Sequence, residues 1–276
     1  MRPIARRLPL VAANLAGAAA FAAPFLLSRP DGSAGGSEAG ARAADAPWLL
    51  ALLMPLLLAV AIAEAGEPGK GMDAKRVALL GVLACLAALL RLPLSLAGAN
   101  LLFLLPILAG AVFGLSFGFL LGALAIAVSA LITGGIGPWL PFQMWAAGWV
   151  GAGAALLRPA VERLRRRPRA AAVILAAYTY VAALFFGGVM NLYFWPVIVS
   201  DAATGWRPGL GLAETFRHYR AFYLLTSLAW DSIGGLVGAG VILAIGGPVL
   251  EMLHRYRRRF SVEVVPEDAA VVTARS

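Results

Sequence analysis

The sequence has few of the residues on which soluble enzymes and disulfide-stapled domains depend. It contains a single cysteine, Cys85, and two histidines, and charged residues make up only 13% of its 276 positions. One cysteine excludes an intramolecular disulfide framework and a multi-thiolate metal site. His218 and His254 fall in different polar regions, which argues against a paired-histidine metal centre. The stretch GEPGKG at 66–71 has the wrong spacing for a Walker A loop, so no ATP site is expected in this chain.

Apolar residues are abundant instead. They make up 61% of the chain, and the mean hydropathy is +0.83. A soluble domain is about half apolar and about a quarter charged, and a core of this length could not shelter so much apolar surface. The composition therefore predicts an all-α polytopic membrane bundle with lipid around it.

Long apolar runs predict eight membrane spans, two of them in the N-terminal region at 8–27 and 47–63. The block 77–157 contains one formal charge, Arg91, and at about 20 residues per crossing it has room for four spans. Glycine, serine and proline predict the breaks within this block at 91–100, 113–117 and 134–141. The last two predicted spans are 170–190 and 221–246.

The net charge of +9 is explained by orientation in a membrane, and we expect no nucleic-acid partner. With both termini in the cytoplasm, 17 of the 23 Lys and Arg lie in the inside segments, as the positive-inside rule requires. The predicted organisation is a two-span extension at 1–76, a six-span core at 77–250 and a basic cytoplasmic tail at 251–276. The first span could instead be a cleaved signal peptide, because MRPIARR precedes an alanine-rich apolar run.

Polar side chains within predicted spans are candidates for function, because hydrocarbon penalises unpaired polar groups. Asp231 is placed about ten residues into the last span, either in a binding site or as a packing carboxylate. Trp139 and Gln143 share one helical face behind the rigid turn GGIGPWLP, and we assign them to a cavity. Trp145 and Trp149 form a second stripe, which we assign to the interfacial belt or to lipid-facing packing.

The connection 191–220 is long and aromatic, and it includes Asn191 and Trp195. It is predicted to lie outside, as a lid over a site or as an amphipathic segment resting on headgroups. Small residues four apart at Gly110, Gly114, Gly118 and Gly122, and again at Gly234 and Gly238, predict closely packed helices.

Two stretches carry a family resemblance: LPILAGAVFGLSFGFLLGAL at 105–124 and TGGIGPWLPFQMWAAGWVGAGAALL at 133–157. The chain from 74 to 254 resembles the substrate-binding S component of energy-coupling factor (ECF) vitamin transporters. Members of that family have six helices with both ends in the cytoplasm, which agrees with the six spans after residue 77. The resemblance implies capture of a vitamin or related micronutrient at the plasma membrane, together with a transmembrane coupling protein and two ATPase subunits.

The resemblance also implies a pocket near the outer face of the later helices. The positions that it indicates here are Trp139, Gln143, Asn191, Trp195 and Asp231, with Arg91 and Asn100 at an outer turn. An Ala-x-x-x-Ala surface on the first core helix is implied to contact the coupling protein, and Ala74 with Ala78 or Ala84 with Ala88 fit that pattern. Relatives that carry nickel or cobalt ions begin with a histidine that this chain lacks, so the expected ligand is organic, for example a corrinoid. No cofactor or metal is expected.

Two other functions fit parts of the sequence. One is a membrane enzyme acting on a lipid-linked substrate, with Asp231 as base and the arginines of 163–169 binding phosphate, although paired carboxylates and metal-ligand spacing are missing. The other is a self-contained secondary transporter, which would need coupling-ion sites beyond one carboxylate.

Overall fold

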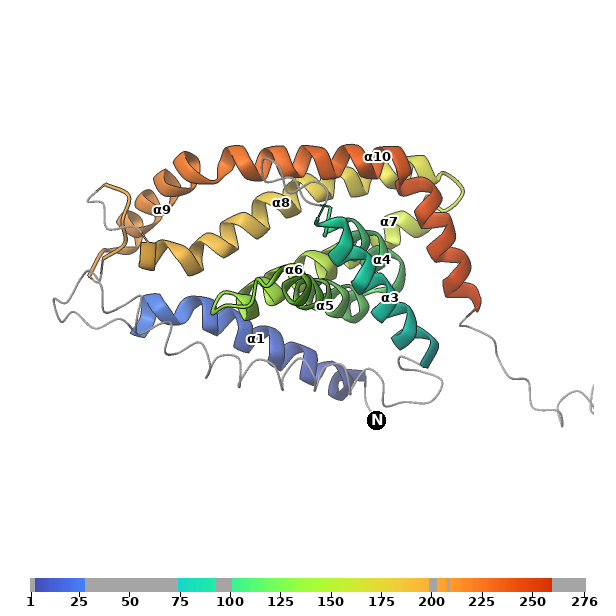
Figure 1. The fold of residues 1–276 in the computed structure, drawn as a ribbon, viewed down its shortest axis with the longest axis horizontal. Coiled ribbons are helices and arrows are strands. Elements are labelled where there is room, and N and C mark those ends of the chain that lie inside the picture. The colour runs from blue at the N-terminus through green and yellow to red at the C-terminus, as the bar shows by residue number, and fades with distance from the viewer. Residues whose placement is uncertain (1–2, 28–73, 93–100, 199–202, 208, 260–276) are drawn as a thin grey trace, which may run out of the picture.

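The structure is a computed structural model that describes residues 3–27, 74–92, 101–198, 203–207 and 209–259 (Figure 1). Throughout these ranges the chain forms helices joined by turns, and no strand is found in them. The predicted all-α fold class is therefore confirmed. Helices satisfy every backbone hydrogen bond within one segment, which is what an apolar environment requires.

The helices differ widely in length. In chain order they are α1 (Pro3–Leu27), α3 (Ala74–Leu90), α4 (Leu104–Phe113), α5 (Leu115–Thr133), α6 (Leu140–Ala154), a 3₁₀ turn (Ala155–Leu157), α7 (Arg158–Arg163), α8 (Pro168–Ile198), α9 (Leu212–Thr226) and α10 (Leu228–Arg259). The predicted breaks near 113–117 and 134–141 are confirmed, since α4, α5 and α6 are separate helices. The predicted boundary between core and tail at residue 250 falls inside α10.

Three of the described helices are long and apolar enough to cross a membrane: Leu115–Thr133, Pro168–Pro196 and Leu228–Arg258. Leu10–Ala22 and Leu104–Phe113 are apolar but shorter. A helix of ten residues rises about 15 Å, which is half of a hydrocarbon core of about 30 Å. The count of eight spans stays a prediction, and the second predicted span, at 47–63, lies outside the described residues.

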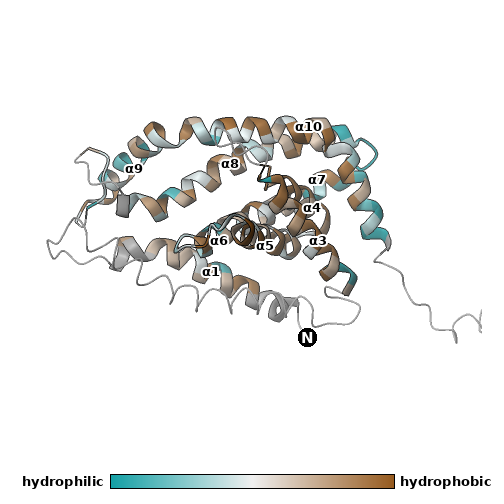
Figure 2. Cartoon of the chain, viewed as in Figure 1, coloured by the Kyte–Doolittle hydropathy of each residue, from teal (hydrophilic) through white to brown (hydrophobic). Residues whose placement is uncertain are grey.

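The helices pack in layers, with α8 beside α10, a central group of α4, α5 and α6, and α1 and α3 beyond it (Figure 1). The two ends of the molecule have different chemistry. One end, here called the basic end, carries Arg158, Arg165, Arg255 and Arg257 on α7, the turn after it and α10. The opposite end, here called the aromatic end, carries Phe25, Trp195, Trp206 and Tyr219. Hydrophilic residues colour the C-terminal part of α10, whereas α4 and α5 are strongly hydrophobic (Figure 2).

Glycines let the central helices approach closely. A Cβ atom on Gly110 or Gly118 would collide with the carbonyl oxygen of Gly151, and one on Gly122 would collide with that of Ala147. The predicted packing role is confirmed for these three glycines. Gly114 has a different role, because it separates α4 from α5. Its φ of 105° is a backbone conformation that favours glycine.

The first helix packs on the core through two tryptophans of α6. Trp145 is fully buried and donates from Nε1 to the carbonyl oxygen of Ala13 at 3.0 Å, and Trp149 donates to Asn14 Oδ1 at 2.5 Å. Gly17 lies against the Trp145 indole with no room for a Cβ. The assignment of Trp145 to a belt or a lipid-facing position is therefore wrong. It fills the interface between α1 and α6, because an indole N–H needs a partner when it is buried.

The predicted last span at 221–246 is wrong at its beginning. Ser227 separates α9 from α10, and residues 221–226 belong to α9. The predicted outer connection at 191–220 is also more ordered than a loop, because α8 continues to Ile198 and α9 begins at Leu212. Exposed apolar side chains on α9, Leu212, Phe216, Leu224 and Leu225, are typical of an interfacial helix.

Candidate functional site

Asp231 lies in the first turn of α10, not ten residues into a span. Its backbone N–H donates to the carbonyl oxygen of Ser227 at 2.9 Å. The positive end of the helix dipole favours a carboxylate in this turn, which lowers the cost of placing Asp231 next to apolar surface. The carboxylate is half-buried and faces α8 and α9.

Two tyrosines of α9 lie beside this carboxylate. Tyr223 donates from its hydroxyl to Asp231 Oδ2 at 3.0 Å, and Tyr219 donates to the carbonyl oxygen of Gly188. Burial, followed by the charge of Asp231, raises the pKa of Tyr219 to about 12. The same two effects and the hydrogen bond to Asp231 also raise the pKa of Tyr223. Both phenols therefore keep their protons at neutral pH and act as hydrogen-bond donors.

A glycine pair on α8 makes room for these groups. A Cβ atom on Gly187 would overlap the Asp231 carboxylate, so a larger residue there would require the carboxylate to move. Gly188 is less crowded, because its nearest neighbour would be the Tyr219 hydroxyl at 3.7 Å. The carboxylate of α10 thus lies directly against the backbone of α8.

Further hydrogen bonds join the same three helices around Asp231. Asn191 of α8 donates from Nδ2 to Ser227 Oγ at 2.6 Å, next to the start of α10. Tyr180 of α8 donates to Ser232 Oγ at 3.3 Å. The structure thus brings together two residues predicted from the sequence, Asp231 and Asn191. We call Tyr180, Asn191, Tyr219, Tyr223, Ser227, Asp231 and Ser232 the Asp231 cluster.

Trp195 lies nearby at the aromatic end and is only 1% exposed. Its Nε1 donates to the carbonyl oxygen of Thr204 at 2.6 Å, and its ring contacts those of Tyr219 and Phe222 at centroid distances of 5.2 and 6.4 Å. Trp195 therefore supports α9, on which Tyr219 and Tyr223 lie. His218 is also buried, with Nδ1 2.9 Å from the carbonyl oxygen of Gly205.

Trp139 and Gln143 lie at the start of α6, and both are half-buried. Phe142, beside Gln143, contacts the ring of Tyr193 on α8 at a centroid distance of 4.5 Å. This contact places the start of α6 near the same part of α8 as Asn191. In Figure 1, α8 lies between α6 and α10, so these two helices pack on different sides of α8.

The remaining predicted site residues are separate from the cluster. Arg91 follows α3 and donates to Ser129 Oγ of α5 at 3.1 Å, which ties the ends of these helices together. Asn100 lies outside the described residues. Of the two alanine pairs on α3, Ala84 and Ala88 are buried within the chain, whereas Ala74 and Ala78 are exposed.

Sequence reasoning missed Tyr219, Tyr223 and Gly187. The tyrosines belong to the stretch HYRAFY, which was interpreted as part of a loop and the start of a span, so their helical spacing was not used. Tyr219 and Tyr223 are four residues apart on α9 and share one face. The glycine gave no usable signal, because membrane helices contain glycine at many packing positions.

The Asp231 cluster offers one carboxylate, phenol and alcohol hydroxyls and one amide. Such a set can donate and accept hydrogen bonds, and it contains one carboxylate. Across the described ranges, no group of three or more His, Cys, Asp or Glu could hold a metal ion. Comparisons of the chain with known protein families, with curated proteins and with solved structures find no match.

Proposed function

We propose that the chain is the membrane-embedded substrate-capture subunit of an ATP-driven ECF-type importer for a vitamin or a related organic micronutrient. The observation that carries this proposal is the Asp231 cluster. A half-buried carboxylate beside long apolar helices costs free energy unless it is hydrogen-bonded, and such residues are candidates for binding sites. Here Tyr223 donates to it, at the end opposite the arginines of α7 and α10.

The orientation follows from the charges. If the basic end faces the cytoplasm, as the positive-inside rule requires, then the Asp231 cluster faces outside, where an importer captures its ligand. The ligand class is an organic molecule with hydrogen-bond donors and an apolar body, because aromatic side chains surround the few polar groups. A corrinoid fits this description, as do other vitamins.

Energy is supplied by other chains in this proposal. The sequence has no Walker A loop, so a coupling protein and two ATPase subunits would drive transport from the cytoplasmic side of the plasma membrane. Ala74 and Ala78, which are exposed near the start of α3, are the candidate contact with the coupling protein. Small residues four apart allow a partner helix to approach closely.

The experiment is vitamin uptake by cells that carry the coupling module, with and without this chain. Native mass spectrometry of the purified protein would first identify a co-purifying ligand to use as the labelled vitamin. We expect uptake to require the chain, and Asp231→Asn to weaken ligand binding about tenfold, as the loss of one charge-assisted hydrogen bond predicts. Gln143→Leu tests the start of α6 in the same assay. Equal uptake with and without the chain would refute the proposal.

A further inference from the structure

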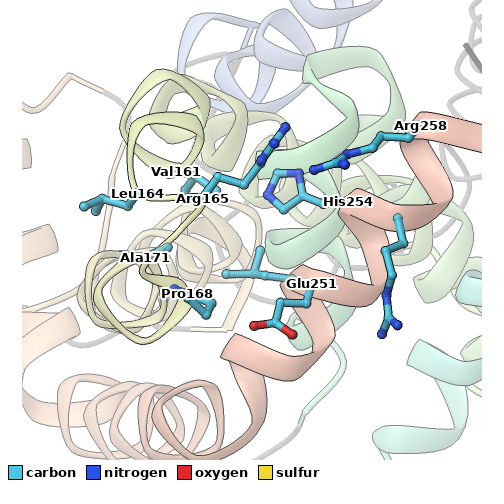
Figure 3. Close-up of a pocket in the computed structure, with 10 residues that line it drawn as sticks. Val161, Leu164, Arg165, Pro168, Ala171, Glu251, His254 and Arg258 are labelled. Atoms are coloured by element: carbon cyan, nitrogen blue, oxygen red, sulfur yellow. The ribbon is translucent and has the colours of Figure 1, made fainter.

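A pocket of about 240 Å³ lies at the basic end, between α7, α8 and α10 (Figure 3). It is lined by the last turns of α10, whereas Asp231 lies in the first turn of that helix. This volume corresponds to about eight water molecules at ~30 Å³ each. One part of its wall is apolar, from Val161, Leu164, Pro168, Ala171 and Leu250. The other part is charged, from Arg165, Arg255, Arg258, His254 and Glu251.

The charged part is unbalanced. Among the lining residues that the structure describes, Arg165, Arg255 and Arg258 are positive and Glu251 is negative, so their summed formal charge is positive even with a neutral histidine. Nearby Glu162 is not a lining residue, and it forms an ion pair with Arg257, which does not line the pocket either. Arg257 also donates to the carbonyl oxygen of Val112 at 3.0 Å, which fixes it away from the cavity.

A buried histidine marks the inner part of the pocket. The side chain of His254 is 9% exposed, and its Nδ1 has no hydrogen-bond partner among the described residues. The nearest carboxylate oxygen, Glu162 Oε1, is 3.9 Å away, which is too far for a hydrogen bond. A buried polar atom without a partner costs free energy, so a ligand that supplies the missing partner is favoured.

The side chains of Arg165 and Arg258 converge on the His254 ring from two sides (Figure 3). Two guanidinium groups close together repel each other, but each is attracted to an anion placed between them, so the anion makes the arrangement favourable. Guanidinium groups pair with phosphate oxygens through two parallel N–H···O bonds, which suits an anion with several oxygens. Glu251 lies on the other side of the pocket, near Pro168 and Ala171 (Figure 3).

We propose that this pocket binds a phosphate group, carried by an anionic lipid headgroup or by free phosphate. The apolar wall and the position at the ends of two helices of membrane-spanning length favour the lipid, since basic pockets between such helices bind anionic headgroups on the cytoplasmic side. The site is independent of the proposed ligand site, because the two lie at opposite ends of the molecule.

The test measures binding of two probes to the full chain in neutral detergent at 0.15 M salt. Phosphatidylglycerol is titrated by native mass spectrometry, with phosphatidylcholine as the zwitterionic reference, and inorganic phosphate is titrated separately by calorimetry. Arg165→Gln and Arg258→Gln remove pocket charges. Arg166→Gln is the matched control, because it removes the same charge from an exposed neighbour outside the pocket.

We expect each pocket variant to weaken phosphatidylglycerol binding about fivefold, which corresponds to ~1 kcal/mol per arginine near a headgroup. Arg166→Gln changes it less than twofold, because Arg166 does not line the pocket. Glu251→Gln has the opposite effect and tightens binding at least twofold. Thermal unfolding of each variant confirms that the fold is retained.

The two probes distinguish the possible sources of the phosphate group. Dependence of phosphatidylglycerol alone on Arg165 and Arg258 identifies a lipid headgroup, and dependence of inorganic phosphate alone identifies a free phosphate. Dependence of both probes supports recognition of the phosphate group itself. If neither probe depends on these arginines more than on Arg166, the pocket is not a phosphate site.

Discussion

At the scale of single residues, the contact between Gly187 and Asp231 is the most demanding feature of the candidate site. A Cβ added at Gly187 would have to displace the carboxylate, which lies against the α8 backbone and accepts a hydrogen bond from Tyr223 of α9. A substitution at Gly187 is therefore expected to change both the packing of α8 against α10 and the position of the Asp231 carboxylate.

The first prediction compares neighbouring glycines. Gly187→Ala is expected to displace the Asp231 carboxylate and to lower stability by about 1–3 kcal/mol, as overpacking does. Gly188→Ala is the control, because its added methyl group meets its nearest neighbour at an ordinary distance of 3.7 Å. Thermal unfolding in detergent measures both variants. A similar loss in the two would mean that Asp231 does not pack against α8 as described.

A second prediction concerns Glu162 on α7. Burial would raise the pKa of its carboxyl, but the hydrogen bond and charge of Arg257, with His254 and Arg158, outweigh burial and the net shift is downward. A lowered folded pKa means that the stabilisation is complete above the ordinary value of 4.5 and is lost as the pH falls through the folded value.

We therefore expect Glu162→Gln to be less stable than the parent at pH 7, by about 1 kcal/mol or less because the pair is partly exposed. The two proteins become equally stable near the acid limit, where the parent carboxylate is protonated. Unfolding midpoints of both proteins across the acid range give the comparison. A difference that stays constant with pH would exclude the ion pair as its cause.

At the scale of elements, α1 is attached to the core by specific contacts. Trp145 donates to the backbone of α1, Trp149 donates to Asn14, and the Phe21 ring contacts that of Phe142 at a centroid distance of 4.9 Å. These contacts indicate that α1 is packed as one helix of the bundle.

The third prediction follows from the contact of Gly17 with the Trp145 indole. Gly17→Ala is expected to push α1 away from α6 and to speed amide hydrogen exchange along α1, because a Cβ there overlaps the indole. Gly81→Ala makes the same chemical change on α3 in open space and leaves exchange in α1 unchanged. Unaltered exchange in Gly17→Ala would show that α1 is not held by this contact.

At the scale of the whole molecule, the two ends have opposite character. The basic end carries the arginines of α7 and α10, and the aromatic end carries the Asp231 cluster and its supporting rings. Lys and Arg are retained on the cytoplasmic side of membrane proteins, so this polarity predicts the orientation.

The fourth prediction tests that orientation by thiol labelling in a Cys85→Ser background. A membrane-impermeant maleimide is expected to label Ile136→Cys, which is exposed between α5 and α6, in intact cells. Arg166→Cys, after α7, reacts only after permeabilisation. The reverse pattern would invert the molecule and put the Asp231 cluster on the cytoplasmic side.

Several features followed from the sequence alone because they depend on local chemistry. Low charge and long apolar runs are enough to predict helices in lipid, since only helices and closed barrels satisfy the backbone there. Glycine and proline act on the local backbone, which is why the break at Gly114 and the turn before α6 could be predicted. The close packing at Gly118 could be predicted because small residues recur at every fourth position along the sequence. Asp231 was recognisable because polar groups are costly in apolar segments, whereas Asn191 was indicated by its place in the predicted outer connection and by the family resemblance.

Other features were decided only by tertiary structure. The sequence alone could not show that Trp145 holds α1, that Gly187 accommodates Asp231 or that Arg165 meets His254, because each pair joins residues from different helices. The spacing within one helix predicts which face a residue occupies, but not which neighbour covers that face. The partner depends on how the helices cross, and the packed core as a whole sets that geometry.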